Sequence, residues 1–261
     1  MQLGVCADPF AIRPFPRPLP FDFIEGHVQN FLRPEAPEAE FAPLDAALAG
    51  AAVKMPAANC LFPADLKVVG PAVDWRRFDG YVETAFRRAQ QSGLRCIVFG
   101  SAGARMVPEG FSAARAFEQY VEALRRMAPV AQRHGLTVVV EPLNRGECNL
   151  INTVEEGFEA AERAAHPSVE LLVDLFHMLR NDEAPGGIVK VGSRIRHAHL
   201  AERDERTAPG VKGDDFRPFL RALRAAGYDS LLTIECHWGD FAAEAAPALA
   251  EVRRQLAESG Y

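Results

Sequence analysis

The sequence has no run of about 18 apolar residues, the length that a membrane-spanning helix requires. Its N-terminus also lacks a basic segment followed by an uninterrupted apolar stretch, so a signal peptide is not expected. The five cysteines are odd in number, and their spacings match no zinc or redox motif. These absences predict a cytoplasmic protein with reduced thiols and no membrane partner.

Positive net charge is also lacking. The chain carries 35 acidic and 29 basic residues, which gives a net charge of −6 and argues against general binding to the backbone of nucleic acids. No Gly-rich phosphate loop with a neighbouring lysine is present, and no linker or low-complexity tract divides the chain. We therefore expect a single domain over residues 1–261, and the missing phosphate loop favours a ligand without a phosphate group.

The composition is that of an ordinary globular protein, with 48% hydrophobic and 25% charged residues. Short apolar runs predict strands at 3–7, 21–28, 53–58, 95–100, 136–141, 170–174, 194–199 and 231–235. Helical spacing predicts helices at 77–93, 112–135, 152–165, 214–227 and 241–260. Strands that alternate with helices indicate an α/β fold, and eight of them over 261 residues favour a single (β/α)8 TIM barrel.

Four of the later strand candidates end on a residue that can bind a hard metal ion: Glu141, Asp174, His199 and Glu235. A parallel barrel brings the carboxyl ends of its strands to one mouth, so these side chains are expected to meet there. Three carboxylates and one imidazole suit Mn²⁺, Mg²⁺ or Co²⁺ better than the thiolate-rich sites of structural zinc. His197 points to the same face as His199 but lies deeper, where we expect a packed interior residue.

Each of these residues also has a structural interpretation. Glu141 could pair with Arg145 or another base, and Glu235 could be a salt-bridged strand end. Asp174 could cap the helix that follows it, which would leave His177 as a structural histidine. The occurrence of four such residues at successive strand ends favours the metal site over four separate coincidences.

Three segments carry a family resemblance: EPLNRGE from 141, DLFHM from 174 and HLAERDERTAPG from 199. With IECHW and FGSAGARMVPEGF, they resemble the xylose isomerase-like TIM-barrel superfamily. The resemblance is closer to its sugar phosphate isomerase/epimerase group, which includes the ketose 3-epimerases of the tagatose and psicose type. It covers nearly the whole chain and is sharpest after residue 95.

The resemblance implies that Glu141, Asp174, His199 and Glu235 hold one divalent metal ion, with Mn²⁺ expected and Mg²⁺, Co²⁺ or Zn²⁺ as alternatives. It also implies that Glu141 and Glu235 are the catalytic acid/base pair. The substrate-binding residues it implies are Glu147, His177 and Arg206. The segment after His199 is one residue longer than the family pattern, so Arg203 is an alternative to Arg206.

Several residues outside these segments are further candidates for the substrate pocket. Asn59 and Ser101 stand near the third and fourth strand ends and could bind hydroxyl groups. Trp238 could form an apolar wall for a sugar or pack at the barrel rim. Cys6, Phe15 and Phe62 are candidate lining residues.

The implied activity is that of an isomerase on a ketose or related keto-sugar, with proton abstraction through a metal-stabilised enediolate and 3-epimerisation as the expected outcome. Aldose–ketose isomerisation would use the same groups. A lyase or dehydratase on a keto-sugar, keto-glycoside or keto-inositol and a hydroxypyruvate isomerase are the alternatives. A non-catalytic sugar-binding barrel is an alternative of another class. The acidic charge disfavours an apurinic-site endonuclease of the same superfamily. The resemblance further implies a homodimer or homotetramer.

Overall fold

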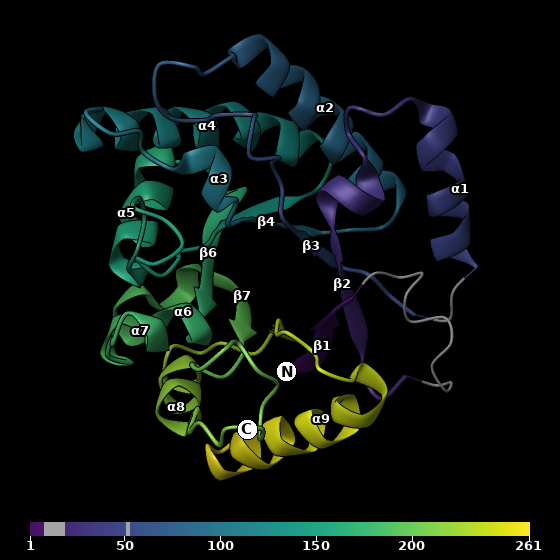
Figure 1. The fold of residues 1–261 in the computed structure, drawn as a ribbon, viewed down its shortest axis with the longest axis vertical. Helices are drawn as coiled ribbons and strands as arrows, with labels where there is room; N and C mark the ends of the chain where they lie inside the picture. Colours follow the sequence, from purple (N-terminus) through teal and green to yellow (C-terminus); the bar gives the residue numbers. More distant parts are fainter. Residues whose placement is uncertain (8–18, 51–52) are drawn as a thin grey trace.

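The computed structural model describes residues 1–7, 19–50 and 53–261. Eight parallel strands close into a barrel in sequence order, as predicted, and helices surround it (Figure 1). The strands are β1 (Gln2–Cys6), β2 (Phe23–His27), β3 (Ala57–Asn59), β4 (Cys96–Phe99), β5 (Thr137–Val140), β6 (Val169–Asp174), β7 (Ile195–Leu200) and β8 (Leu231–Ile234). The predicted TIM barrel is confirmed. Phe15, a predicted lining residue, lies outside the described residues.

The five predicted helices are present as α2 (Trp75–Gln91), α4 (Ala113–Arg133), α5 (Val154–Ala164), α8 (Arg217–Ala225) and α9 (Phe241–Glu258). Within the described residues, five further helical segments were not predicted: η1 (Val28–Leu32), α1 (Glu38–Ala49), α3 (Ala102–Arg105), α7 (Gly186–Val191) and η2 (Gly192–Arg194). A sixth, α6 (Leu175–Arg180), follows Asp174, where only the structural interpretation of Asp174 expected a helix. Most are one or two turns long, too short for a periodic pattern. In the longer α1, only Phe41 and Leu48 are buried, so no apolar stripe marks it.

The third strand was predicted at 53–58 but lies at Ala57–Asn59. Pro56 explains the shift, because it has no N–H to donate to a sheet. Its carbonyl oxygen instead accepts from the backbone N–H groups of Arg95 and Cys96, at 2.7 and 3.1 Å, and regular pairing with β4 begins at Ala57. Asn59 thereby becomes the last residue of the strand and faces the mouth.

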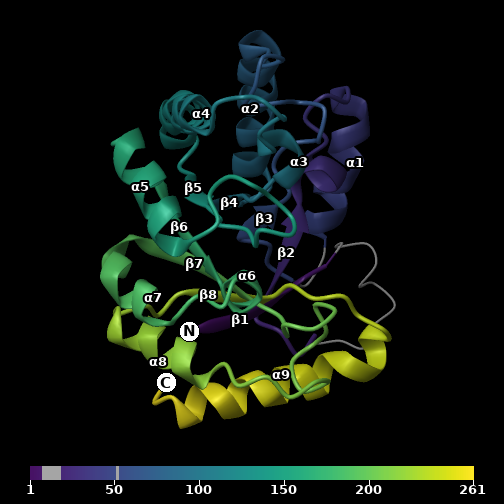
Figure 2. The same cartoon turned by 60° about the vertical axis from the view of Figure 1, so that its left-hand side comes forward.

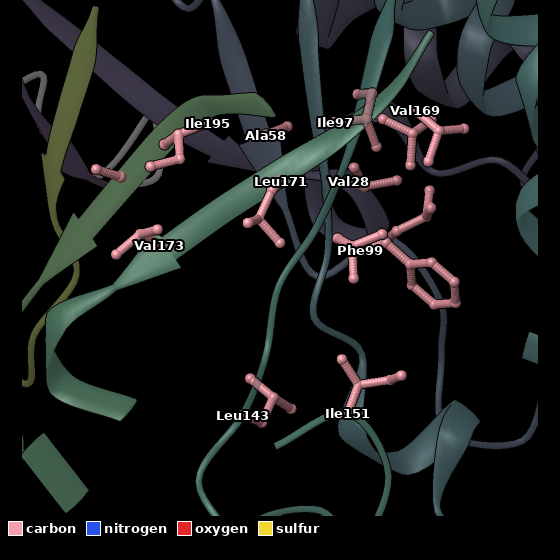
Figure 3. Packing of buried hydrophobic residues seen from close by; sticks show 14 of the residues in the cluster. Val28, Ala58, Ile97, Phe99, Leu143, Ile151, Val169, Leu171, Val173 and Ile195 are labelled. Atoms are coloured by element: carbon pink, nitrogen blue, oxygen red, sulfur yellow. The ribbon is translucent and has the colours of Figure 1, made fainter. Parts of the chain in front are cut away.

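Side chains alternate between the barrel interior and the layer under the helices, which matches the period of two in a strand. On β4, Ile97 and Phe99 belong to the main core, whereas Cys96 and Val98 belong to a small interior cluster with Val139. Figure 3 shows this main core around β6, where Leu171 and Val173 lie among apolar side chains of other strands and loops. The apolar packing fixes the strands whose ends carry the polar residues.

Both chain ends lie near the amino ends of the strands, side by side in both views (Figure 2). The terminal amine of Met1 forms an ion pair with Asp229, and the hydroxyl of Tyr261 donates to the carbonyl oxygen of Tyr228 at 2.9 Å. The carboxyl ends of the strands are therefore left open for a site. None of the helices in the described ranges is long and apolar enough to cross a membrane.

Candidate functional site

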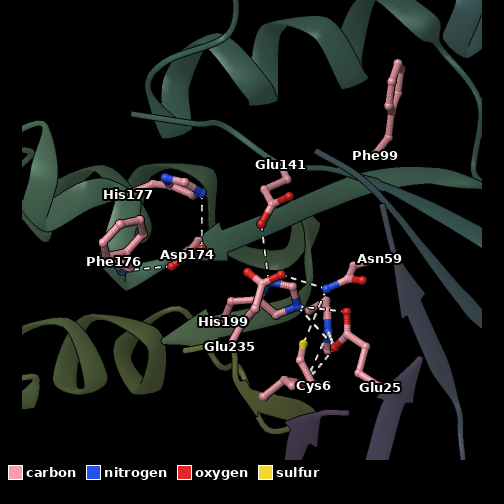
Figure 4. Close-up of polar contacts among 12 residues, drawn as sticks. Cys6, Glu25, Asn59, Phe99, Glu141, Asp174, Phe176, His177, His199 and Glu235 are labelled. Atoms are coloured by element: carbon pink, nitrogen blue, oxygen red, sulfur yellow. Dashed lines mark hydrogen bonds and ion pairs between the residues drawn. The ribbon is translucent and has the colours of Figure 1, made fainter. Parts of the chain in front are cut away.

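The four residues predicted as metal ligands converge at the carboxyl mouth of the barrel (Figure 4). Glu141 follows β5, Asp174 ends β6, His199 is the penultimate residue of β7 and Glu235 follows β8. Each offers one ligand atom, and these atoms all lie within 4.8 Å of one another. Residues from Glu141 to Glu235, 94 positions apart in the sequence, thus form one cluster of three carboxylates around one imidazole.

The two oxygens of Asp174 have different roles. Oδ1 accepts from the backbone N–H of Phe176 at 2.8 Å and so caps helix α6, as the structural interpretation proposed. Oδ2 is buried and has no hydrogen-bond partner among the described residues, and His177 Nε2 and Arg206 Nη2 approach it at 3.5 and 3.6 Å. Burial raises the pKa of Asp174 to about 6 although the charges of Arg206 and His199 oppose this. The unpartnered Oδ2 is available for a cation.

Glu141 is held by the end of strand β4 rather than by Arg145. A Cβ at Gly100 would come within 1.6 Å of Glu141 Oε2, so only glycine leaves room for this carboxylate. The fully buried Arg105 donates from Nη2 to the backbone carbonyl oxygen of Glu141 at 2.7 Å. Arg145 instead contacts Asn152, so the proposed pairing between Glu141 and Arg145 is wrong.

His199 lies at the centre of the cluster. Its Nδ1 is 3.2 Å from both Glu141 Oε1 and Glu235 Oε2. Its Nε2 faces Glu25, at 3.0 and 3.1 Å from the two carboxylate oxygens. Burial would lower the pKa of His199, but the charges of Glu25 and Glu235 outweigh it and raise that pKa well above its usual value. The cluster therefore attracts positive charge.

Glu235 is held on both oxygens. Asn59 Nδ2 donates to Oε1 at 2.6 Å, and Arg206 Nη2 forms an ion pair with Oε2. Burial would raise the pKa of Glu235, but the charges of His199 and Arg206 outweigh it and hold that pKa at about 2. Glu235 is consequently an ionised carboxylate in a defined orientation.

The structure places Arg206, and not Arg203, at the cluster. The guanidinium of Arg206 stacks 4.5 Å above the ring of Phe176. Arg203 instead forms an ion pair with Asp182 at 2.8 Å, and its side chain is 44% exposed. The geometry thus favours Arg206 over the alternative, Arg203.

Glu147 and His177 lie beside the cluster and share Asn144. The backbone N–H of Asn144 donates to His177 Nδ1 at 3.1 Å, and its Nδ2 donates to Glu147 Oε1 at 2.8 Å. A nitrogen that accepts this bond carries no proton, so neutral His177 has its hydrogen on Nε2, directed to Asp174. Burial lowers the pKa of His177 to about 4, so the ring is a neutral donor at pH 7.

Two adjoining cavities open on Glu235 and Asn59. One, of about 490 Å³, extends along β1 and β2 and includes Cys6, as predicted. The other, of about 170 Å³, includes Ser101 and the predicted substrate-binding residues Glu147, His177 and Arg206. A small ligand at the cluster would contact both.

Two predicted lining residues lie elsewhere. Phe62 is buried among Phe78, Tyr81 and Phe99, with ring centroids 5.1–5.4 Å apart, so it belongs to the core and the prediction is wrong. Trp238 packs edge-on against Phe241 at 5.0 Å and lines neither cavity, which agrees with the packing role at the rim.

Sequence reasoning missed Glu25, which projects from β2 into the barrel beneath the cluster (Figure 4). Its carboxylate contacts His197, His199 and Thr233, and its exposed fraction is 1%. Burial would raise the pKa of Glu25, but the charges of His199 and His197 outweigh it and hold that pKa well below its usual range. The available signal was the position of Glu25 in the middle of the predicted strand FDFIEGHV, directly after Phe23 and Ile24, because a buried charge requires partners.

The donor set fits a divalent cation. Three carboxylates and one imidazole converge, and Asp174 Oδ2 is buried without a hydrogen-bond partner in the described ranges. Asn59 and Arg206 hold the side chain of Glu235 in place. Oxygen ligands with one imidazole are typical of Mn²⁺ and related hard ions. The residues present are therefore suited to bind such an ion between Glu141, Asp174, His199 and Glu235.

Two proteins named as ketose 3-epimerases are similar in sequence to this chain. The chain is 33% identical over 120 residues to a D-psicose 3-epimerase of Ruminiclostridium cellulolyticum, over 46% of this chain and 41% of that protein. It is 28% identical over 167 residues to a probable ketose 3-epimerase of Synechocystis, over 62% of this chain and 56% of that protein. The matches thus span about half the length of these relatives.

A solved structure has the same fold. The D-psicose 3-epimerase of Clostridium cellulolyticum H10 with D-tagatose superimposes with a TM-score of 0.82 over 98% of this chain and 99% of that chain, at 22% identity. The family model described as xylose isomerase-like TIM barrel matches residues 19–258. The resemblance seen in the sequence is confirmed, and the chain belongs to the xylose isomerase-like TIM barrel family.

Proposed function

We propose that this protein is a divalent-metal-dependent sugar epimerase that inverts C3 of a ketose. The observation that carries the proposal is the placement of two carboxylates, Glu141 and Glu235, each 3.2 Å from the same imidazole nitrogen of His199. The similarity to ketose 3-epimerases over part of their length supports the same reaction class. The substrate is a free ketose or a related keto-sugar.

The residues that would hold the metal ion are Glu141, Asp174, His199 and Glu235, and we propose Mn²⁺ as the ion. When bound, the ion would supply Lewis acidity and a template for two substrate oxygens. The charge balance supports such binding, because three carboxylates face one imidazole and one arginine.

Glu235 and Glu141 would carry the proton transfers. The low pKa of Glu235, about 2, makes it an ionised base at neutral pH. One glutamate removes the proton from C3, and the resulting enediolate is planar at that carbon. The other glutamate, which must start in its protonated form, delivers its proton to the opposite face, which inverts the configuration. The two glutamates thereby exchange protonation states. Epimerisation requires two groups on opposite sides of one carbon, and strands β5 and β8 supply them from different parts of the barrel.

The remaining residues would orient the sugar. His177 carries its hydrogen on Nε2 and stays neutral, so it can donate to a substrate oxygen without competing for the transferred proton. Arg206 would donate to an oxygen beside the reacting carbon, and Glu147 would accept from a terminal hydroxyl. Asn59 lies between the two cavities and would contact both Glu235 and the sugar.

The test follows solvent deuterium. Metal-stripped protein is incubated with ketoses, ketose phosphates and keto-glycosides in D₂O, with or without Mn²⁺, and proton NMR is recorded after the Mn²⁺ has been chelated. We expect Mn²⁺-dependent deuterium at C3 together with a new diastereomer. Deuterium at C1 would indicate aldose–ketose isomerisation, and a lost substituent would indicate a lyase. The absence of exchange on every substrate would contradict the proposal.

Single variants separate the two glutamates. Glu141→Gln and Glu235→Gln each keep the shape of the side chain but remove the base. If each glutamate acts on one face of the sugar, each variant should lose epimerisation. Each variant should also exchange the C3 deuterium of only one of the two epimers with solvent hydrogen. Equal exchange on both epimers in either variant would contradict a two-base mechanism.

Residues 1–261 are also proposed to form one domain that assembles as a homodimer or homotetramer. Closure of all eight strands into one barrel supports the single domain, and the family resemblance supports the assembly. Light scattering of the purified protein would test the assembly, and a monomer at micromolar concentration would contradict it.

A further inference from the structure

Glu25 is a buried carboxylate for which the proposed proton transfers have no use. It lies on β2, below the mouth, and its side chain has no exposed surface. Its two oxygens face three side chains from strands β7 and β8: His197, His199 and Thr233. A charge so deep in a protein is expensive unless hydrogen bonds compensate it.

The contacts assign the hydrogens in this network. His197 Nε2 and Thr233 Oγ1 lie 2.7 and 2.8 Å from Glu25 Oε2, and His199 Nε2 lies 3.0 Å from Oε1. An ionised carboxylate has only acceptor positions, so it accepts from all three. The opposite nitrogen of His197, Nδ1, is buried and has no partner in the described structure, which agrees with a hydrogen on Nε2.

His199 therefore links two acidic layers through its two nitrogens. Nε2 donates downward to Glu25, while Nδ1 faces Glu141 and Glu235 at 3.2 Å in the mouth. A metal ion binds the nitrogen that carries a lone pair, and the hydrogen bond made by the other nitrogen decides which one this is. The ring cannot easily turn, because it packs edge-on against His197 with centroids 4.7 Å apart.

We propose that Glu25 is a positioning residue that holds the hydrogen of His199 on Nε2 and thereby presents Nδ1 to the metal ion. This inference rests on the proposed metal site and adds the residue that selects the ligand atom. Glu25 contacts no reacting atom in this arrangement. Its effect passes through His199 alone.

A second interpretation of the same geometry exists. Cys6, Glu25 and His199 also bring one ligand atom each within 4.8 Å of one another, so Glu25 could be a ligand of a second metal ion. Three donors already occupy Glu25, and burial raises the pKa of the Cys6 thiol well above its usual value. Both observations disfavour a thiolate–carboxylate site, and metal stoichiometry distinguishes the two interpretations.

The first experiment uses the wild-type chain labelled with ¹⁵N-histidine and loaded with Zn²⁺, which is diamagnetic. Long-range proton–nitrogen NMR identifies the histidine whose nitrogen moves into the metal-bound range. We expect that ring to bind through Nδ1 and to keep a hydrogen on Nε2. A ring bound through Nε2 would overturn the inference, and this result does not depend on any variant.

The second experiment measures Mn²⁺ binding by titration calorimetry in wild type, Glu25→Gln and Thr233→Val. Glu25→Gln replaces an acceptor by an amide that also donates, so the hydrogen of His199 is no longer held on Nε2. We expect the Mn²⁺ affinity of this variant to fall by about 10–100-fold. Thr233→Val removes one donor to Glu25 without touching His199, so its affinity should stay close to wild type. If Glu25→Gln does not fold, Glu25→Asp is the substitute, because it keeps the charge but moves the carboxylate away from His199. Its Mn²⁺ affinity is also expected to fall.

The outcomes separate this inference from the proposed function. Failure of wild type to bind Mn²⁺ or Zn²⁺ would overturn the metal site itself. Binding by wild type with unchanged affinity in the Glu25 variant would overturn only the positioning role. Equal losses in Glu25→Gln and Thr233→Val would also overturn it, because packing would then explain both. Two ions per wild-type chain, reduced to one in Glu25→Gln and in Cys6→Ser, would establish Glu25 as a ligand.

Discussion

The side chain of Arg206 binds both the side chain and the backbone of Glu235. Its Nη2 forms an ion pair with Glu235 Oε2, and its Nε donates to the backbone carbonyl oxygen of Glu235 at 3.0 Å. The guanidinium also stacks on Phe176. Arg206 belongs to the loop after β7, and in this position it orients the carboxylate of Glu235, which follows β8.

This relationship predicts that Arg206→Ala and Arg203→Ala differ sharply. Arg206→Ala removes the donors to Glu235 and leaves its partly buried carboxylate less compensated, so we expect kcat/KM to fall by about 100-fold or more. Arg203→Ala removes only an exposed ion pair with Asp182, worth at most about 1 kcal/mol. Steady-state kinetics on the substrate found by NMR would compare the two. Similar losses in both variants would contradict the assignment of Arg206.

Asp174→Asn should separate metal binding from helix capping. Asparagine caps helices as well as aspartate does, so helix α6 should persist, whereas the unpartnered carboxylate charge is lost. We expect Mn²⁺ affinity to fall by more than the roughly 10–100-fold that is typical when a residue hydrogen-bonded to a metal ligand is changed. The metal-free Tm should stay equal or rise. Asp74→Asn, at the cap of helix α2, is the matched control and should not change Mn²⁺ binding.

Glu202 holds the loop that carries Arg206, so we expect a change at Glu202 to loosen that loop. The buried carboxylate accepts from the backbone N–H groups of Gly210 and Gly213 at 2.8 Å each and from those of Lys212 and Asp214. Glu202→Gln turns one acceptor into a donor facing these groups. We expect a loss of about 1–3 kcal/mol in unfolding free energy.

The same variant should show faster amide hydrogen exchange over 207–214 and a raised KM. Glu205→Gln is the control, because Glu205 is exposed and its side chain forms an ion pair with Lys212 at 2.9 Å, away from the backbone groups that Glu202 binds. Unchanged exchange over this loop in the Glu202 variant would show that the carboxylate does not hold it.

The raised pKa of Glu183 predicts that the stability of the folded protein depends on pH. Its Oε1 accepts from the backbone N–H of Val154 at the start of helix α5, and burial raises its pKa from 4.5 to about 7. A raised carboxyl pKa means that the folded state holds this proton more tightly than the unfolded state. The stability from this group is therefore fully present below pH 4.5 and is lost as the pH rises to about 7.

Glu183→Gln should consequently match wild type in Tm near pH 4.5 and exceed it at pH 8, by about 2–4 °C for each kcal/mol gained. Thermal unfolding at several pH values would measure this difference. Glu159→Gln, an exposed change on the same helix, should shift Tm equally at all pH values. A parallel shift in both variants would contradict the role of Glu183.

The amino-acid sequence by itself determined the class of fold and the members of the cluster. Apolar runs and helical spacing depend on local periodicity, so seven strands and five helices were predicted within a few residues of their observed bounds. A parallel barrel brings strand ends together whatever its loops do, so Glu141, Asp174, His199 and Glu235 could be expected to meet. The short helices and the displaced β3 were missed because one or two turns, or a proline at a strand start, leave little local signal.

Only the tertiary structure decided what each polar group contacts. The two oxygens of Asp174 serve a helix cap and the mouth at once, and Arg206 rather than Arg203 reaches Glu235. Glu25 comes 174 positions before His199, and no local pattern connects them. These roles depend on the direction of side chains across a closed barrel. That direction follows from strand register and packing among distant segments, which spacing along the chain does not encode.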